Sequence, residues 1–275
     1  MIVVTGASGQ LGRAVVDRLL DRASAGEIGV SVRDPKGFDG RGVRVRRGDF
    51  AEPATLDAAF EGASTVLIVS ADTLGEQALR LHRNAIDAAV ASGAKRVLYT
   101  SHMGVSPSSA FQPMVDHAAT EDLLAASGVA ITLLRNGFYA STLPRLLQHA
   151  LDSGELRVPE DGPVAWTAHA DLAEATARIL VDGGFDGPTP PLTGPEAVDM
   201  ARVTAIANKI TGRTIRHVVV SDEEYHASLP EPMGELMLGM FVTSRRGDFG
   251  PADPALAGLL GRPATSVEDY LRGTL

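Results

Sequence analysis

The 275-residue sequence contains no cysteine, which excludes disulfides, thiolate nucleophiles and cysteine metal sites. Any redox chemistry would therefore need a cofactor. No apolar run approaches the roughly 18 residues that a membrane span requires, and the chain enters a strand pattern at once, without a charged leader. We expect a cytoplasmic protein with no membrane partner.

Positive charge is also scarce. Lysine and arginine number 25 against 34 aspartates and glutamates, so the formal net charge is −9. Only Lys36, Lys95 and Lys209 are lysines, and the basic residues are scattered along the chain. This charge pattern provides no general attraction to nucleic-acid phosphates or anionic lipid, so we expect no nucleic-acid partner.

The catalytic Tyr-x-x-x-Lys pair of ordinary short-chain dehydrogenases is missing too. In that pair the lysine lowers the pKa of the tyrosine, which then exchanges a proton near neutral pH. The residues four positions beyond the four tyrosines are Met103, Leu143, Leu229 and Thr274. The sequence also has no GxxxxGK[ST] loop, no G-x-S-x-G motif and no histidine spacing typical of a metal site, so kinase, hydrolase and metalloenzyme chemistry are disfavoured.

The sequence does contain an alternation of β-branched runs and amphipathic stretches, which is typical of parallel strands joined by helices. Strands are predicted at residues 2–5, 28–32, 43–47, 65–70, 96–101 and 131–135. Helices are predicted after residue 10 and at residues 53–60, 75–91, 116–126, 168–181 and 203–210. We expect an α/β fold, with a Rossmann-type doubly wound parallel sheet over residues 1–140. Residues 141–275 are expected to form a smaller C-terminal α+β substrate lobe, interleaved with late elements of the sheet.

The stretch TGASGQLG, residues 5–12, joins the first predicted strand to the first helix. Gly6, Gly9 and Gly12 permit a tight turn there and let backbone N–H groups approach a pyrophosphate. The positive end of the helix dipole favours the same anion. We predict a dinucleotide-binding loop, although a purely structural glycine turn is the alternative. Its other predicted cofactor-binding residues are Ser8, Gln10 and Leu11.

The residues after the second strand discriminate between cofactors. An arginine there accommodates a 2′-phosphate and an acidic residue binds a ribose 2′-hydroxyl; here Arg33 follows the strand directly. Arg13 lies in the first helical turn, where its positive charge interacts unfavourably with the positive end of the helix dipole unless an anion lies nearby. NADP(H) is the predicted cofactor, with NAD bound through Asp34 as the alternative. Asp49 and Phe50, after the third strand, are placed to meet the adenine, although an ordinary loop explains them equally well.

Candidate catalytic residues follow the later strands, whose carboxyl ends bind ligands in such sheets. Ser70, at the end of the fourth strand, is assigned to the cofactor site, and Ser101 ends the fifth. His117 and Glu121 share one helical face in the region where the missing tyrosine and lysine would lie. Histidine can donate a proton near neutral pH, so we predict His117 and Ser101 as catalytic. The alternatives are a helix-stabilising ion pair for His117 and a strand-end hydroxyl for Ser101.

Several segments, taken in order, are typical of one family. They are TGASGQLG, VRDP, Gly48-Asp49-Phe50, Leu81-His82-Arg83-Asn84, YTS at 99–101, the helix containing Asp116-His117 and Thr120-Glu121, TLLRNGFY at 132–139 and ADLA at 170–173. The chain resembles the NmrA-like family of atypical short-chain dehydrogenases/reductases, and its quinone-reducing members in particular. The resemblance implies two lobes, NADP(H) on the sheet and a quinone-sized pocket between nicotinamide and the C-terminal lobe. It also implies that Asn136 binds the cofactor and that Tyr139 is catalytic; the alternative for Phe138 and Tyr139 is a place in the core.

Quinone reduction fits the missing tyrosine, because hydride addition yields a stabilised hydroquinone anion and positioning carries most of the rate. We predict an NADP(H)-dependent oxidoreductase that passes a hydride to quinone-like or other conjugated acceptors, without metal or flavin. The alternatives are a non-catalytic NADP(H) sensor that acts through protein partners and a specialised biosynthetic reductase. The apolar run 233–241 has helical spacing and lines either the substrate pocket, the lobe core or a subunit interface. A homodimer is left open.

Overall fold

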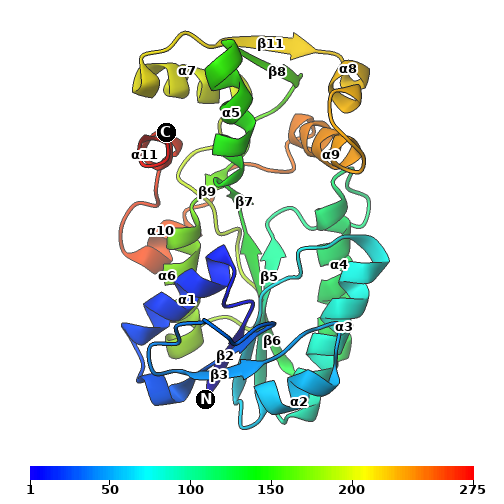
Figure 1. Ribbon diagram of the computed structural model, residues 1–275, viewed down its shortest axis with the longest axis vertical. Helices are drawn as coiled ribbons and strands as arrows, with labels where there is room; N and C mark the ends of the chain where they lie inside the picture. Colours follow the sequence, from blue (N-terminus) through cyan, green and yellow to red (C-terminus); the bar gives the residue numbers. More distant parts are fainter.

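A seven-stranded, wholly parallel sheet forms the centre of the protein (Figure 1). The computed structural model describes all 275 residues. The strand order is β10-β6-β5-β4-β1-β2-β3. Their bounds are Ile2–Thr5 (β1), Ile28–Val32 (β2), Arg44–Arg47 (β3), Thr65–Ile68 (β4), Arg96–His102 (β5), Ala130–Asn136 (β6) and Gly187–Pro188 (β10). The order reverses between β1 and β4, which is the arrangement of a doubly wound Rossmann-type fold, so the predicted fold class is confirmed.

Helices cover both faces of the sheet, because successive strand residues point to opposite sides. Val4 contributes to a core cluster under α1 (Gln10–Leu20) and α6 (His169–Asp182). Val3 contributes to the opposite cluster, which is covered by three helices. These are α2 (Ala54–Phe60), α3 (Gly75–Ala91) and α4 (Gln112–Ala126). A short 3-10 turn, η1 (Ala25–Glu27), precedes β2. No helix is both long enough and apolar enough to cross a membrane.

A second lobe lies beyond the carboxyl ends of the strands, at the top of Figure 1. Its core cluster includes Trp166, Met240 and Phe241. Its two-stranded parallel sheet pairs β8 (Glu155–Pro159) with β11 (Arg216–Val220), and β7 (Phe138–Tyr139) pairs with β9 (Trp166–Thr167). The helices of this lobe are α5 (Thr142–Ser153), α7 (Met200–Thr211), α8 (Asp222–Ala227), α9 (Met233–Arg245) and α11 (Val267–Arg272). Helix α10 (Ala255–Leu260) instead packs on α6 and adds Leu256 and Leu260 to the core cluster under α1.

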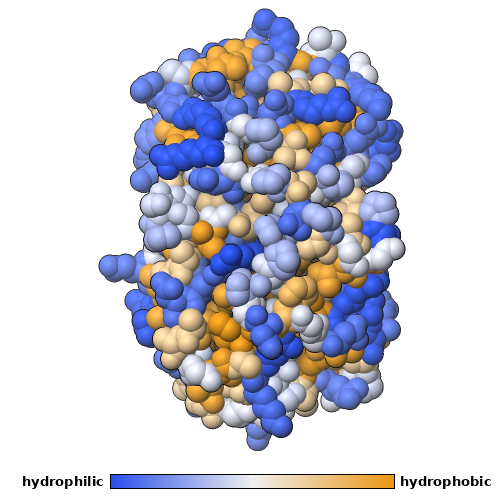
Figure 2. Space-filling model, turned by 180° about the vertical axis from the view of Figure 1, so that it is seen from behind, coloured by the Kyte–Doolittle hydropathy of each residue, from blue (hydrophilic) through white to orange (hydrophobic).

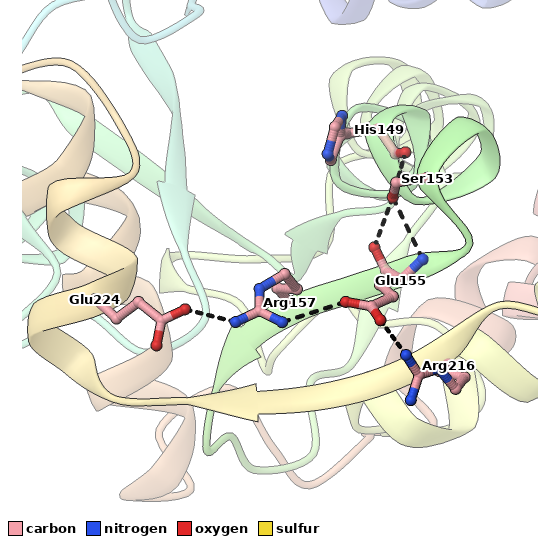
Figure 3. A network of polar contacts seen from close by, with 6 residues as sticks. All are labelled: His149, Ser153, Glu155, Arg157, Arg216 and Glu224. Atoms are coloured by element: carbon pink, nitrogen blue, oxygen red, sulfur yellow. Dashed lines mark hydrogen bonds and ion pairs between the residues drawn. The ribbon is translucent and has the colours of Figure 1, made fainter.

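Charged side chains link the small sheet of this lobe to α8 (Figure 3). Glu155 on β8 pairs with Arg216 on β11 and with Arg157, which in turn reaches Glu224 at 2.6 Å. The Ser153 hydroxyl donates to the His149 carbonyl at 2.9 Å and closes the end of α5. Since these groups are largely solvated, the network fixes geometry more than it adds stability.

The structure differs from the sequence-based prediction at two elements near the site. Helix α4 begins at Gln112 rather than at residue 116, because Pro113 fits the first helical turn, so His117 lies in the second turn. The seventh strand β10 was not predicted, since a Gly-Pro pair carries no strand pattern. Both α6 and β10 follow residue 141 and yet lie against the central sheet; the division at residue 140 itself stays a prediction.

Candidate active site

The glycine loop lies after β1, at the point where the strand order reverses. Gly6 has φ +60°, a left-handed conformation that favours glycine. A Cβ on Gly12 would lie 2.3 Å from the Gly6 carbonyl oxygen, so only glycine lets α1 approach the loop this closely. Gly6, Ser8, Gly9 and Gln10 are exposed, whereas Leu11 and Gly12 are buried. The loop therefore offers its outer backbone to a ligand and packs its inner side against the sheet.

The first turn of α1 suits an anion. Its N-cap residue Gly9 has no side chain to accept from the first N–H groups, and the first turn contains no acidic residue. Arg13 is exposed, with its guanidinium carbon 5.2 Å from the centre of the Phe38 ring. Uncapped N–H groups at a helix start, together with a nearby cation, are the features that bind a diphosphate.

Arg33 follows β2 on the same side as the glycine loop. It is exposed and makes no ion pair, whereas Arg18 and Arg41 pair with Asp21 and Asp17. One carboxylate oxygen of Asp34 accepts the Lys36 N–H at 2.9 Å and closes a local turn. Arg33 is thus available to an anionic ligand, while Asp34 is partly committed to the loop.

The remaining predicted cofactor residues lie along the carboxyl edge of the sheet. Asp49 accepts the Ala51 N–H at 2.9 Å, and the Phe50 carbonyl accepts from Asn84 on α3 at 2.8 Å. Ser70 follows β4 and its N–H donates to Thr100. Asn136 ends β6 and is 1% exposed, yet neither its amide oxygen nor its amide nitrogen has a partner. A buried amide without partners is costly, and because both of its polar atoms are closed to solvent, the structure shows no open path from this amide to a ligand.

A cavity of about 650 Å³ opens beyond the carboxyl ends of β4, β5 and β6 and extends to the start of α9. Its lining includes the predicted residues Ser70, Ser101, His117 and Tyr139. The apolar part of its wall includes Leu74, Phe111, Phe138, Met233 and Leu236. Asn136 is not part of the lining, although its neighbour Gly137 is. Of the apolar run 233–241, Met233 and Leu236 line the cavity, while Met240 and Phe241 are buried in the lobe core.

His117 points toward β5 rather than toward Glu121. Its Nδ1 lies 2.8 Å from the Tyr99 hydroxyl, and burial, reinforced by the neighbouring His102 and His82, lowers the pKa of His117 to about 3. The imidazole is therefore neutral near pH 7 and is a poor source of a proton in the free protein. His117 therefore contacts Tyr99 and forms no ion pair with Glu121, so the alternative of a helix-stabilising surface pair is wrong.

Glu121 forms a separate network at the end of β5. It accepts the Ser101 hydroxyl at 2.6 Å and pairs with Arg135 at 2.8 Å. The Ser101 proton is thus engaged within the protein, which leaves Ser101 an oxygen lone pair with which to accept from a ligand.

Two residues that line the cavity, His82 and His102, and the buried Tyr99 that they surround were not among the predicted site residues. His82 on α3 contacts Tyr99, which is completely buried, and His102 stacks on His117 with ring centres 6.3 Å apart. Burial lowers the pKa of both His82 and His102 to about 4. Each histidine comes from a different element, so local spacing could not identify the cluster; the only sequence signal was the presence of His82 and Tyr99 in family-typical segments.

The fold and the cavity define a dinucleotide-binding α/β protein with a ligand pocket at the switch point of its sheet. Comparison with known proteins is more specific: the NmrA-like family model matches residues 1–271, so the chain belongs to the NmrA-like family. Quinone oxidoreductase 2 of Escherichia coli (strain K12) is 31% identical over 283 residues, covering 98% of this chain and 96% of that protein. NAD(P)H azoreductase of Xenophilus azovorans is 29% identical, with 99% of this chain and 97% of that protein covered.

Solved structures agree with this assignment. The NADPH-dependent quinone oxidoreductase from Escherichia coli, solved with NADPH, superposes with a TM-score of 0.93 at 30% identity and 99% coverage of both chains. The negative transcriptional regulator NmrA, solved with NAD, gives a TM-score of 0.75 at 20% identity, covering 99% of this chain and 94% of that one. The second similarity establishes a common fold only.

Proposed function

We propose that the protein is an NADPH-dependent oxidoreductase that reduces quinone-like or other conjugated acceptors. The observation that carries the proposal is the 650 Å³ cavity, which adjoins the glycine-loop edge of the sheet and combines apolar walls with a few polar groups. Such a cavity suits a flat, mostly apolar ligand that is oriented by one or two hydrogen bonds. The similarity to quinone oxidoreductase 2 and to NAD(P)H azoreductase agrees with that ligand chemistry.

The residues present fit NADPH. The uncapped start of α1 would hold the diphosphate, and the unpaired Arg33 with Arg13 would hold the 2′-phosphate. Asp49 and Phe50 would border the adenine, and Ser70 and Asn136 the nicotinamide side. When bound, NADPH supplies a hydride with its electron pair.

The other proposed roles belong to cavity residues. His117 would donate a hydrogen bond to the acceptor, while Tyr139 and Phe138 would form part of the cavity wall beside the acceptor. Ser101 would accept a hydrogen bond from a donor group of the cofactor or of the reduced product, because its own proton is held by Glu121 and a quinone has no hydrogen to donate. On this proposal, catalysis consists of orienting the acceptor and stabilising the charge that develops on it.

The outer surface favours an enzyme over a sensor that acts through partners. The exposed large hydrophobic residues are Leu74, Val90, Val181, Val219, Met233 and Leu275. Two of them, Leu74 and Met233, border the cavity instead of forming an outer patch. On the face shown in Figure 2, hydrophobic residues form patches separated by hydrophilic ones. A partner-binding surface usually presents a broader continuous apolar area.

A cavity-filling variant tests the proposal. With benzoquinones and naphthoquinones as acceptors, Leu236→Trp should raise the acceptor KM at least several-fold and leave the Kd for NADPH unchanged, since Leu236 lines only the acceptor side. Val219→Trp, on the exposed edge of the second lobe, is the matched control and should behave as the wild type. Tight NADPH binding with no reduction of any quinone by the wild type would reject the proposal in favour of a sensor.

A further inference from the structure

A chain of hydrogen bonds connects His117 to Tyr99, His82 and Thr120 at the wall of the cavity. It contains two backbone groups: the Ala71 N–H donates to His82 Nε2 at 2.9 Å, and the Asp116 carbonyl accepts from the Thr120 hydroxyl at 2.8 Å. A backbone N–H can only donate and a carbonyl oxygen can only accept. These two bonds therefore fix the donor and acceptor roles of His82 and Thr120.

These roles determine the tautomer of His82. Because its Nε2 accepts from Ala71, a neutral His82 carries its hydrogen on Nδ1. That Nδ1 lies 2.9 Å from the Thr120 oxygen, whose own proton is engaged by Asp116, so Nδ1–H donates to Thr120. The same Nδ1 lies 3.5 Å from the Tyr99 hydroxyl oxygen, which thus faces an N–H group on one side.

Tyr99 is the hydrogen-bond partner of His117. Burial raises the pKa of Tyr99 well above its ordinary value, so the phenol keeps its proton. The phenol also approaches Thr120, whose own proton is engaged by Asp116, and its shortest contact is with His117 Nδ1 at 2.8 Å, so we assign the phenol proton to that contact. A neutral His117 with an accepting Nδ1 carries its hydrogen on Nε2. That nitrogen has no partner in the protein and is not among the buried unpartnered atoms, while the residue lines the cavity.

We propose that Tyr99 and His82 are positioning residues that hold His117 as the neutral tautomer with hydrogen on Nε2, so that His117 presents a fixed N–H donor to an acceptor oxygen in the cavity. The identity of that oxygen rests on the proposed function, whereas the tautomer does not. As hydride and its electron pair add to the conjugated acceptor, the carbonyl π bond breaks, NADPH becomes NADP⁺, and the oxygen gains negative charge. His117 stabilises that charge and keeps its own proton, while the oxyanion takes a proton from water.

The tautomer can be measured without turnover. In protein labelled with 15N-histidine, the imidazole resonances of His117 are assigned by their loss in His117→Gln. At pH 7 the wild type should show a hydrogen on Nε2 and a bare Nδ1, and Tyr99→Phe should shift His117 to a mixture of tautomers. Tyr225→Phe is the matched control, because Tyr225 packs edge-on against Phe241 in the second lobe. A wild-type His117 with hydrogen on Nδ1, or no change in Tyr99→Phe, would overturn the proposal.

Kinetics supply the second readout. Tyr99→Phe should lower kcat with quinones about tenfold, the loss expected from one orienting hydrogen bond, with the acceptor KM and NADPH affinity within twofold of the wild type. Equal loss in Tyr225→Phe would indicate a general structural effect and count against positioning. If no quinone is reduced by the wild type, the proposed function fails, and the resonances of His117 still decide the tautomer.

Discussion

Replacement of Gly12 by alanine should damage the fold, whereas the same change at Gly9 should damage cofactor binding alone. A Cβ on Gly12 would lie 2.3 Å from the Gly6 oxygen, about 1 Å inside ordinary contact, and the obstacle is backbone that cannot rotate away. Helix α1 must then shift from β1. Overpacking of this kind costs about 1–3 kcal/mol.

Gly9 meets different surroundings. Its φ of −83° suits any residue, and a Cβ there would lie 3.3 Å from the same oxygen, which a small adjustment relieves. The added methyl group would instead stand on the exposed side of the loop, where a diphosphate must approach the backbone. We expect Gly9→Ala to keep the stability of the wild type and to weaken NADPH binding about tenfold or more.

Thermal unfolding without ligand and fluorescence titration with NADPH measure the two effects separately. Gly12→Ala should lower Tm by about 5 °C, from the usual 2–4 °C per kcal/mol for a chain of this size. Gly258→Ala is the control, because no atom lies within 4 Å of its added Cβ. Wild-type NADPH affinity in Gly9→Ala, or equal destabilisation by Gly9→Ala and Gly12→Ala, would refute the reasoning.

Three further predictions concern charge. Arg33→Glu should weaken the binding of NADPH far more than the binding of NADH, and Arg22→Glu should change neither affinity. Equal losses of affinity for both nucleotides in titrations would show that Arg33 does not bind the 2′-phosphate. Burial lowers the pKa of His82 to about 4. Between pH 6.5 and pH 4, His82 is therefore protonated in the unfolded state and neutral in the native state. The free energy of unfolding falls as the pH falls through this range, by about 1.4 kcal/mol per pH unit for this residue. Urea unfolding at pH 7, 6 and 5 should show a shallower loss in His82→Gln, and identical slopes would contradict the assignment. Asp171→Asn should lower the free energy of unfolding by about 2–3 kcal/mol, because the buried Asp171 carboxylate accepts hydrogen bonds from the segment 262–265. Glu155→Gln, in the exposed network of Figure 3, should lower it by less than about 1 kcal/mol. Similar losses in thermal unfolding would show that burial does not control the strength of these pairs.

The central sheet could be predicted because its signals are local. β1 and β2 have the predicted bounds, and the glycine loop between β1 and α1 carries its own turn chemistry. The ends of elements were less certain. β6 extends one residue beyond its predicted range at each end, because strand length depends on pairing with β5 over seven residues, which no window of sequence reveals.

The second lobe shows why other features could not be predicted. β8 and β11 pair although about sixty residues separate them; β11 does not alternate, and the polar–apolar alternation of β8 covers only four residues before Pro159. The site has the same limit: His117 was recognised by its spacing from Glu121, yet its actual partner Tyr99 comes from a neighbouring strand. The partner of His117 depends on long-range packing of α4 against β5, whereas local spacing in the sequence indicated only that His117 belongs to the site. The homodimer and the residue-140 boundary stay predictions.

The most direct test of the account is a single-turnover experiment without oxygen, in which NADPH-loaded protein is mixed with a naphthoquinone and nicotinamide absorbance is followed. We expect one equivalent of NADPH to be oxidised per hydroquinone formed, faster than in the uncatalysed reaction, and a slower rate when the transferred hydrogen at nicotinamide C4 is deuterium. Bound NADPH that stays reduced in the presence of every quinone tested would contradict hydride transfer as the function of this cavity.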